Sequence, residues 1–354
     1  MHNSQILREL VAGFDLNLDG LNVYTEAASG HYAYGPVLAA LAGAKHVTAQ
    51  VRDSRFGSAQ DIISRTRQLA ESYGVGYLIE CVERRSHQHL ARADIVTNSG
   101  HVRPIDRDLI DALKPTAVIP LMWETWEFRS SDFDLNYCKE RGVVVLGTNE
   151  RHPPCNMLGF IGLCSLKLLF DLGFDGGKVL LMGNAPVPAS PMVDYMRRIG
   201  IDVTWVSSNP DGDLGYEEIK DHFRDHGGQY DIMILAEHRL HDLILGTGGL
   251  LDFKAIKAIN PAIKIGVMCG NVDVQGLSDS GLRYVPKHIA PVGFMSYQPY
   301  MLGPRPVLTL YAGGLKVGEA MARARIRGLS PRDSVVDAMA KSPAMDFEGT
   351  LSWI

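Results

Sequence analysis

Short apolar runs alternate with helical patterns along most of the chain, and this alternation constrains the fold more than any other feature. In the first half, the apolar runs cover residues 21–25, 46–51, 77–82, 93–97, 117–122 and 143–146. The helical patterns between them cover residues 36–42, 59–73, 106–113 and 133–141. Such spacing predicts parallel strands joined by crossover helices. Because these crossovers are nearly always right-handed, we expect a doubly wound sheet.

A second α/β series follows a long apolar helix. The helix is predicted over residues 156–172, after Pro153-Pro154 and before Gly173. The later strands are expected at 179–182, 203–206, 232–235, 263–268 and 284–286, with a helix at 192–199. The sequence therefore predicts an α/β protein with two Rossmann/flavodoxin-like, doubly wound parallel-sheet domains joined by a long helix.

The end of the chain is predicted to be helical. Helices are expected at 315–327 and 331–340, with Ser330 as the N-cap and Pro331 at the first helical position of the second. Gly313-Gly314 is predicted as a break that opens the first helix, where it either presents backbone N–H groups to an anion or allows close packing. We therefore divide the chain into domains at 1–152 and 153–307, with a tail at 308–354 that packs back on them.

Length, charge and cysteine use exclude several classes of protein. The 354 residues suffice for about two domains, and 35 basic against 40 acidic residues give a net charge of −5. This balance argues against nucleic-acid binding, which needs a basic surface. No apolar run approaches the ~20 residues of a membrane span, and the charged N-terminus is no signal peptide. Five cysteines without a CxxC spacing indicate a reducing cytoplasm and no metal site.

Polar segments follow the strands of the first half, where ligands of parallel sheets bind. The segments are Glu26 with residues 29–32, then 52–55, 98–103, 123–127 and 148–152. They form either a lined cleft or solvated loops with ion pairs. The candidate substrate-binding residues are Asn98, Ser99, Gly100, His101, Trp123, Glu124, Asn149 and Glu150. Arg103 and Arg151 could clamp a carboxylate or phosphate through paired N–H donors, or pair with surface carboxylates.

A degenerate phosphate-binding turn opens the second half at residues 183–189. Of the usual small residues only Gly183 is present, and Pro186, Pro188 and Pro191 remove donors. The turn is therefore either a cofactor loop or a relict that binds nothing. The candidate cofactor-binding residues are Gly183, Asn184, Ala185, Val187, Ser207, Ser208, Glu237, Cys269 and Asn271. Ser29-Gly30 and Asp53 form a competing nucleotide site in the first half.

Two further side chains have a possible chemical role. His288 follows the last predicted strand between Pro286 and Pro291, where a neutral imidazole could pass a proton. Cys269 would be a nucleophile only in an electropositive environment, so a buried thiol is the favoured interpretation.

The order of these pieces resembles the D-2-hydroxyacid dehydrogenase (formate/glycerate dehydrogenase-like) superfamily over residues 94–300. The resemblance rests on the segment 94–149, the helix 156–172 as linker, the turn 183–189 and His288 after a proline. It implies a flavodoxin-like substrate domain at 1–152 and a Rossmann-like NAD(P)-binding domain at 153–307, with His288 as proton donor. Cys269 stands where the family has its catalytic arginine, which marks a divergent member. Arg103 or Arg151 would then replace that arginine.

The resulting hypothesis is an NAD(P)-dependent oxidoreductase acting on a small polar or anionic metabolite in the cleft between its domains. The expected cofactor is NAD or NADP, with NAD favoured, and the expected assembly is a cytoplasmic homodimer without nucleic-acid or membrane partners. Two alternatives stay open. One is a non-redox lyase, ligase or transferase that uses the polar cleft of the first domain. The other is an inactive binding protein on the dehydrogenase scaffold.

Overall fold

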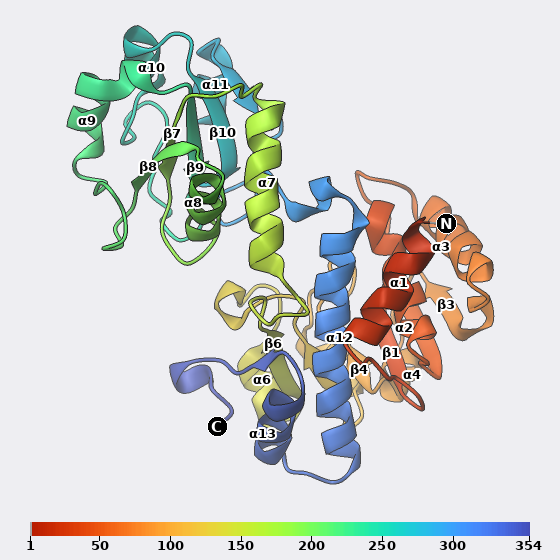
Figure 1. Ribbon diagram of the computed structural model, residues 1–354. Helices are drawn as coiled ribbons and strands as arrows, with labels where there is room; N and C mark the ends of the chain where they lie inside the picture. The colour runs from red at the N-terminus through yellow and green to blue at the C-terminus, as the bar shows by residue number, and fades with distance from the viewer. Residues whose placement is uncertain (1) are drawn as a thin grey trace. The chain divides into compact units, whose positions relative to one another are not determined.

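The computed structural model describes residues 2–354 and divides into two compact units. Unit 1 comprises Met1–Asn156 and Gly303–Ile354, and unit 2 comprises Met157–Leu302. Each unit contains one sheet of mainly parallel strands with helices around it (Figure 1), which confirms the predicted α/β class. The segment Gly303–Ile354 at the C-terminal end of the chain belongs to unit 1.

The sheet of unit 1 has the order β12-β6-β5-β4-β1-β2-β3. Its strands are β1 (Asn22–Glu26), β2 (His46–Gln50), β3 (Ile79–Val82), β4 (Ile95–Val96), β5 (Val118–Pro120), β6 (Val144–Thr148) and β12 (Ala344–Met345). All pairs are parallel except β12 with β6. Without β12, this is the 3-2-1-4-5-6 order of classic dinucleotide-binding sheets. This half therefore has a doubly wound parallel sheet, as the sequence predicted.

Local sequence signals set the helices of unit 1. The α-helices are α1 (His2–Gly13), α2 (Gly35–Leu41), α3 (Ala59–Ser72), α4 (His87–Arg92), α5 (Arg107–Ala112), α6 (Leu135–Glu140), α12 (Pro304–Ile326) and α13 (Pro331–Lys341). Short 3₁₀ turns are η1 (Gly30–Tyr34), η2 (Gly76–Leu78), η3 (Thr125–Glu127) and η6 (Gly349–Leu351). Ser330 caps α13 by accepting the N–H of Asp333, as predicted, and Ser58 caps α3 in the same way.

Helix α12 runs along the sheet of unit 1 and contacts β4, β5 and β6 (Figure 1). Gly313 and Gly314 lie inside this helix, so the predicted break is wrong and the alternative of close packing is correct. A Cβ at Gly313 would lie 3.0 Å from the Cys155 sulfur, and one at Gly318 would lie 2.8 Å from Ile95 Cγ2. The glycines thus let the helix backbone approach the sheet.

Unit 2 has the strand order β11-β10-β9-β7-β8. Its strands are β7 (Lys178–Met182), β8 (Asp202–Val206), β9 (Ile232–Ala236), β10 (Lys264–Cys269) and β11 (Arg283–Val285). Its helices are α7 (Met157–Asp171), α8 (Ala189–Arg198), α9 (Ile219–His226), α10 (Phe253–Ile259) and α11 (Val274–Asp279), with 3₁₀ turns η4 (Gly227–Gln229) and η5 (Pro299–Leu302). This is the 2-1-3-4-5 order of flavodoxin-like sheets, so unit 2 also has a doubly wound parallel sheet, as predicted.

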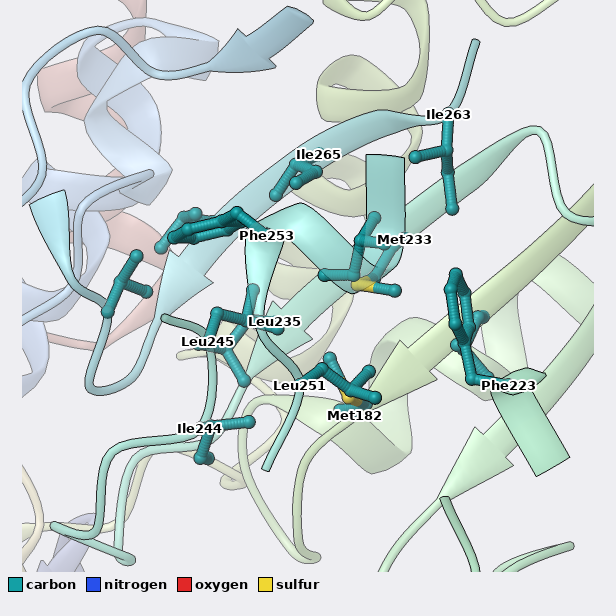
Figure 2. Packing of buried hydrophobic residues seen from close by; sticks show 14 of the residues in the cluster. Met182, Phe223, Met233, Leu235, Ile244, Leu245, Leu251, Phe253, Ile263 and Ile265 are labelled. Atoms are coloured by element: carbon teal, nitrogen blue, oxygen red, sulfur yellow. The ribbon is translucent and has the colours of Figure 1, made fainter. Parts of the chain in front are cut away.

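Both faces of the unit 2 sheet are buried, because successive residues of each strand join different core clusters. Leu180, Met233 and Ile265 pack in one cluster, whereas Val179, Ile232 and Ile234 pack in the other. Figure 2 shows the first cluster, in which Phe223 of α9 and Phe253 of α10 lie against Met233 and its neighbours. This arrangement explains why the strands read as continuous apolar runs. Within residues 2–354, no helix is both long and apolar enough to cross a bilayer.

We predict that Gly318→Ala in α12 destabilises the protein by about 1–3 kcal/mol. The added methyl group meets Ile95 and Pro120, both rigid neighbours, and this overpacking outweighs the gain in helix propensity. Urea denaturation measures the change in the free energy of unfolding. Gly13→Ala in α1 is the control, because a Cβ there has nothing within 4 Å. Equal stability of the two variants would contradict the close approach of α12.

Candidate functional site

The carboxyl edge of the unit 1 sheet collects the polar segments that the sequence predicted. The structure places Asn98–Arg103 after β4, Trp123 and Glu124 after β5, and residues 149–151 after β6. Hydrogen bonds link these segments: Met122 N–H donates to Asn98 Oδ1 at 2.9 Å, and Thr148 N–H donates to the Trp123 carbonyl at 2.9 Å. The predicted substrate-binding residues therefore lie at one edge of one sheet.

A buried hydroxyl network fixes the point where β1 and β4 meet. Thr97 Oγ1 lies 2.9 Å from Thr25 Oγ1 and 2.8 Å from Ser99 Oγ. The Tyr311 hydroxyl, supplied by α12, hydrogen-bonds Thr25. Burial raises the pKa of Tyr311, so this phenol stays protonated. Sequence reasoning missed Tyr311, because no local pattern connects α12 to a strand 286 residues earlier.

His101 is held in one tautomer at the same edge. Its backbone N–H donates to Glu26 Oε2 at 2.7 Å, and its Nδ1 lies 3.1 Å from the Ala27 carbonyl. Because a carbonyl only accepts, Nδ1 carries the proton and Nε2 has a lone pair. Nε2 has no partner among residues 2–354. His101 can therefore accept a proton from a ligand.

Three hydrogen-bond donors at this edge lack an acceptor in the described part of the chain. They are Asn98 Nδ2, Arg103 Nε and Trp123 Nε1, and Asn98 is fully buried. The Arg103 guanidinium carbon lies 5.0 Å from the centre of the Trp123 ring, and its Nη1 donates to Asp132 at 2.8 Å. Unpaired buried donors are costly, and an acceptor oxygen from a ligand would satisfy them.

Three carboxyl groups gather beside these donors. Glu124 accepts the Trp126 Nε1 proton at 2.7 Å and the Glu150 N–H at 3.3 Å. Burial and Glu124 raise the pKa of Glu127 to about 7, although Arg129 opposes the shift. Burial and the two other carboxylates also raise the pKa of Glu150. Near neutral pH the cluster therefore holds protons. No group of three or more His, Cys, Asp or Glu side chains within residues 2–354 is arranged to hold a metal ion.

The turn after β1 leaves its backbone donors open. Ala27 N–H donates to the Gln50 carbonyl at 3.0 Å, but the N–H groups of Ala28, Ser29 and Gly30 have no partner within residues 2–354. Gly30 has φ +64° and a Cβ there would meet nothing within 4 Å. Consecutive free N–H groups beside a topological switch point suit a phosphate or another anion.

The corresponding turn of unit 2 uses the first three of its backbone donors internally. Gly183 N–H donates to the Val206 carbonyl at 3.0 Å, Asn184 N–H to Glu237 Oε2 at 2.9 Å, and Ala185 N–H to Asn209 Oδ1 at 2.8 Å. Pro186 and Pro188 have no N–H to offer. Only the N–H groups of Val187, Ala189 and Ser190, at and just before the start of α8, are then left for a dinucleotide within residues 2–354.

The buried Glu237 carboxylate takes the place that a bound anion would take. Besides Asn184, it accepts the Tyr216 hydroxyl at 2.9 Å and the N–H groups of Arg239 and Leu240 at 2.8 and 3.0 Å. Glu237 is only 1% exposed. A pyrophosphate would meet a partly occupied turn and the like charge of Glu237, so the residues of this turn fit the predicted cofactor poorly.

The other site residues predicted in unit 2 form hydrogen bonds within the unit, are buried, or lie exposed without a carboxylate partner. Ser207 Oγ donates to Asn184 Oδ1 at 2.9 Å, and Asn271 Nδ2 donates to the His241 carbonyl at 2.7 Å. Cys269 is fully buried, and burial together with Glu237 raises the pKa of its thiol. His288 lies on an exposed turn after β11, with no carboxylate partner within residues 2–354.

Similarity to known proteins is confined to solved structures, because neither the family models nor the curated proteins gave a match. The dipicolinate synthase chain from Bacillus halodurans is 10% identical with a TM-score of 0.49, over 88% of this chain and 98% of that one. D-2-hydroxyisocaproate dehydrogenase is 12% identical with a TM-score of 0.45, over the same shares. The NAD-complexed D-isomer specific 2-hydroxyacid dehydrogenase from Lactobacillus delbrueckii ssp. bulgaricus is 12% identical with a TM-score of 0.42, again over 88% and 98%.

These structures include dehydrogenases of the kind that the sequence resembles. Because every reported TM-score lies below 0.5, the α/β assignment rests on the strand order of the chain itself. The activity must be argued from its residues.

We predict that Glu237→Ala destabilises the protein by ~3 kcal/mol or more, because it leaves buried donors without an acceptor. Glu237→Gln keeps one oxygen and loses less stability. Urea denaturation measures both changes. Glu217→Ala is the control, since Glu217 is exposed and close in sequence to Tyr216. A loss for Glu237→Ala no larger than that of the control would refute the role of this carboxylate.

Proposed function

We propose that this chain is an NAD(P)-dependent oxidoreductase that acts on a small anionic metabolite bound at the carboxyl edge of unit 1. The observation that carries the proposal is the group of unpaired donors on Asn98, Arg103 and Trp123. Arg103 adds a positive charge that Trp123 and Asp132 hold in position. A carboxylate would supply the missing acceptors and match that charge.

The dinucleotide is assigned to the turn after β1 in unit 1. The strand order and the free N–H groups of Ala28, Ser29 and Gly30 support this place. The assignment differs from the one that the family resemblance implies, because the donors of the unit 2 turn are already engaged by Glu237 and other groups. A bound nicotinamide would supply the hydride chemistry.

The residues of this edge then have separate roles. Arg103 binds the carboxylate of the metabolite, and Asn98 and Trp123 orient it through their free N–H groups. His101 accepts or returns a proton at Nε2, because its Nδ1 proton is held by the Ala27 carbonyl. The predicted role of His288 as proton donor stays a prediction.

A matched pair of substitutions tests the place of the nucleotide. Ser29→Asp adds a negative charge to the open turn of unit 1, and we expect NADH and NADPH affinity to fall by about tenfold or more. Ser190→Asp adds the same charge at the first turn of α8 in unit 2, and we expect no change. Fluorescence titration of the bound nicotinamide measures both affinities. Loss of binding in Ser190→Asp alone would move the nucleotide to unit 2.

We propose NADPH as the preferred nucleotide, in place of the NAD that the sequence favours, on the side chains after β2. One Asp53 oxygen accepts the Ala59 N–H at 2.7 Å, whereas Arg52 and Arg55 are exposed cations. An arginine at this position accommodates the 2′-phosphate of NADP. We therefore expect Arg55→Ala to weaken NADPH about tenfold and to leave NADH unchanged in the same titration. Equal weakening of both nucleotides would place Arg55 away from the 2′-phosphate.

A second candidate is a non-redox enzyme that uses the same edge. Buried carboxylates stand at both switch points, Glu26 beside β4 and Glu237 beside β7, and each disfavours an incoming anion. If the wild-type protein binds neither NADH nor NADPH at millimolar concentration, while it still binds a small carboxylate, this second function holds.

A further inference from the structure

The carboxyl edge of unit 1 carries both hydrogen-bond donors without an acceptor and carboxyl groups. Asn98 Oδ1 receives the Met122 N–H, so the unpaired Asn98 Nδ2 lies at the end of β5, where Trp123 and Glu124 follow. Arg103 stacks beside the same Trp123. Donors without an acceptor and a group of carboxyl groups thus follow the neighbouring strands β4, β5 and β6 at one edge of the sheet.

The carboxyl cluster has two members open to a ligand. Both oxygens of Glu124 are engaged, by Trp126 and by the Glu150 N–H. The side-chain oxygens of Glu127 and Glu150 receive no hydrogen bond within residues 2–354. Both side chains are half-buried rather than sealed in the core. An ammonium group offers three donors and a positive charge to such a pair.

The charged groups around the pair leave room for one more cation. Arg129 opposes the pKa rise of Glu127, and Arg151 opposes that of Glu150. Arg151 is exposed, and its backbone N–H donates to Asn149 Oδ1. Two arginines therefore face three carboxyl groups, Glu124, Glu127 and Glu150, so one further cation would balance the cluster.

We propose that the metabolite bound at this edge is an α-amino acid, with its carboxylate on Asn98, Arg103 and Trp123 and its ammonium on Glu127 and Glu150. The proposal rests on the substrate site assigned under the proposed function and names the class of ligand for it. The fully buried Asn98 amide without an acceptor is the observation that separates this arrangement from an ordinary acidic surface. A 2-hydroxy acid would satisfy the donors but leave the carboxyl pair without a cation.

Calorimetric titration of the full chain with matched pairs of ligands tests this assignment. The pairs are alanine with lactate, aspartate with malate, and phenylalanine with phenyllactate. We expect at least one amino acid to bind about tenfold or more tightly than its hydroxy partner. Glu150→Gln and Glu127→Gln should each remove that preference while hydroxy-acid binding stays unchanged. Glu140→Gln, an exposed residue of α6, is the control and should keep the preference.

Proton release provides a readout that a purely structural role would not move. An ammonium close to the pair favours the ionised carboxylates, so binding near pH 7 should release a proton in the wild type. Titrations in buffers of different ionisation enthalpy measure that proton, which Glu127→Gln should abolish or reduce. Hydroxy acids that bind as tightly as amino acids would overturn the inference and leave the proposed function standing. If NADPH binds but no carboxylate of either kind does, the substrate site itself is wrong.

Discussion

A backbone N–H after a strand can bind an anion only if no other group already accepts its hydrogen bond. The two units differ in this respect. In unit 2, Asn184 N–H is bound by the Glu237 carboxylate and Ala185 N–H by Asn209. In unit 1, Ser29 and Gly30 have no such partner within residues 2–354. An occupied donor contributes nothing to a phosphate, whereas a free one gains a charge-assisted bond. The assignment of the nucleotide follows from this difference more than from the strand order.

The substrate edge depends on charges that the fold brings together from separate strands. Arg103 follows β4, Glu124 and Glu127 follow β5, and Glu150 follows β6. Burial, helped by the neighbouring Glu124 carboxylate, raises the pKa of Glu127 to about 7, so this group holds a proton near neutral pH. The same edge holds unpaired hydrogen-bond donors. A ligand with a negative and a positive group would supply acceptors for these donors and a cation for the carboxyl groups.

The sequence predicted these segments because local patterns determine them. Apolar runs mark the strands, and polar residues directly after each run mark the edge, so the places of Asn98, Trp123 and Glu150 follow from chain order. The strand order does not follow from the chain order, because the side on which β3 or β9 joins its sheet depends on how the crossover packs. Neither Tyr311 nor the use of Glu237 as an internal acceptor has a local signal. Gly313 and Gly314 resemble a helix break in sequence, and only the sheet beneath α12 explains them.

In both units a carboxylate accepts a backbone N–H across the point where the strand order reverses. The two units differ in which strand carries the carboxylate and which turn supplies the N–H. Glu26 ends β1 and reaches the His101 N–H after β4, away from the turn that β1 itself opens. Glu237 follows β9 and reaches back to the Asn184 N–H, inside the turn that β7 opens. The same contact therefore leaves the first turn of unit 1 available and closes that of unit 2. Pro186 and Pro188 have no N–H to donate, so the turn of unit 2 also has fewer backbone donors than that of unit 1.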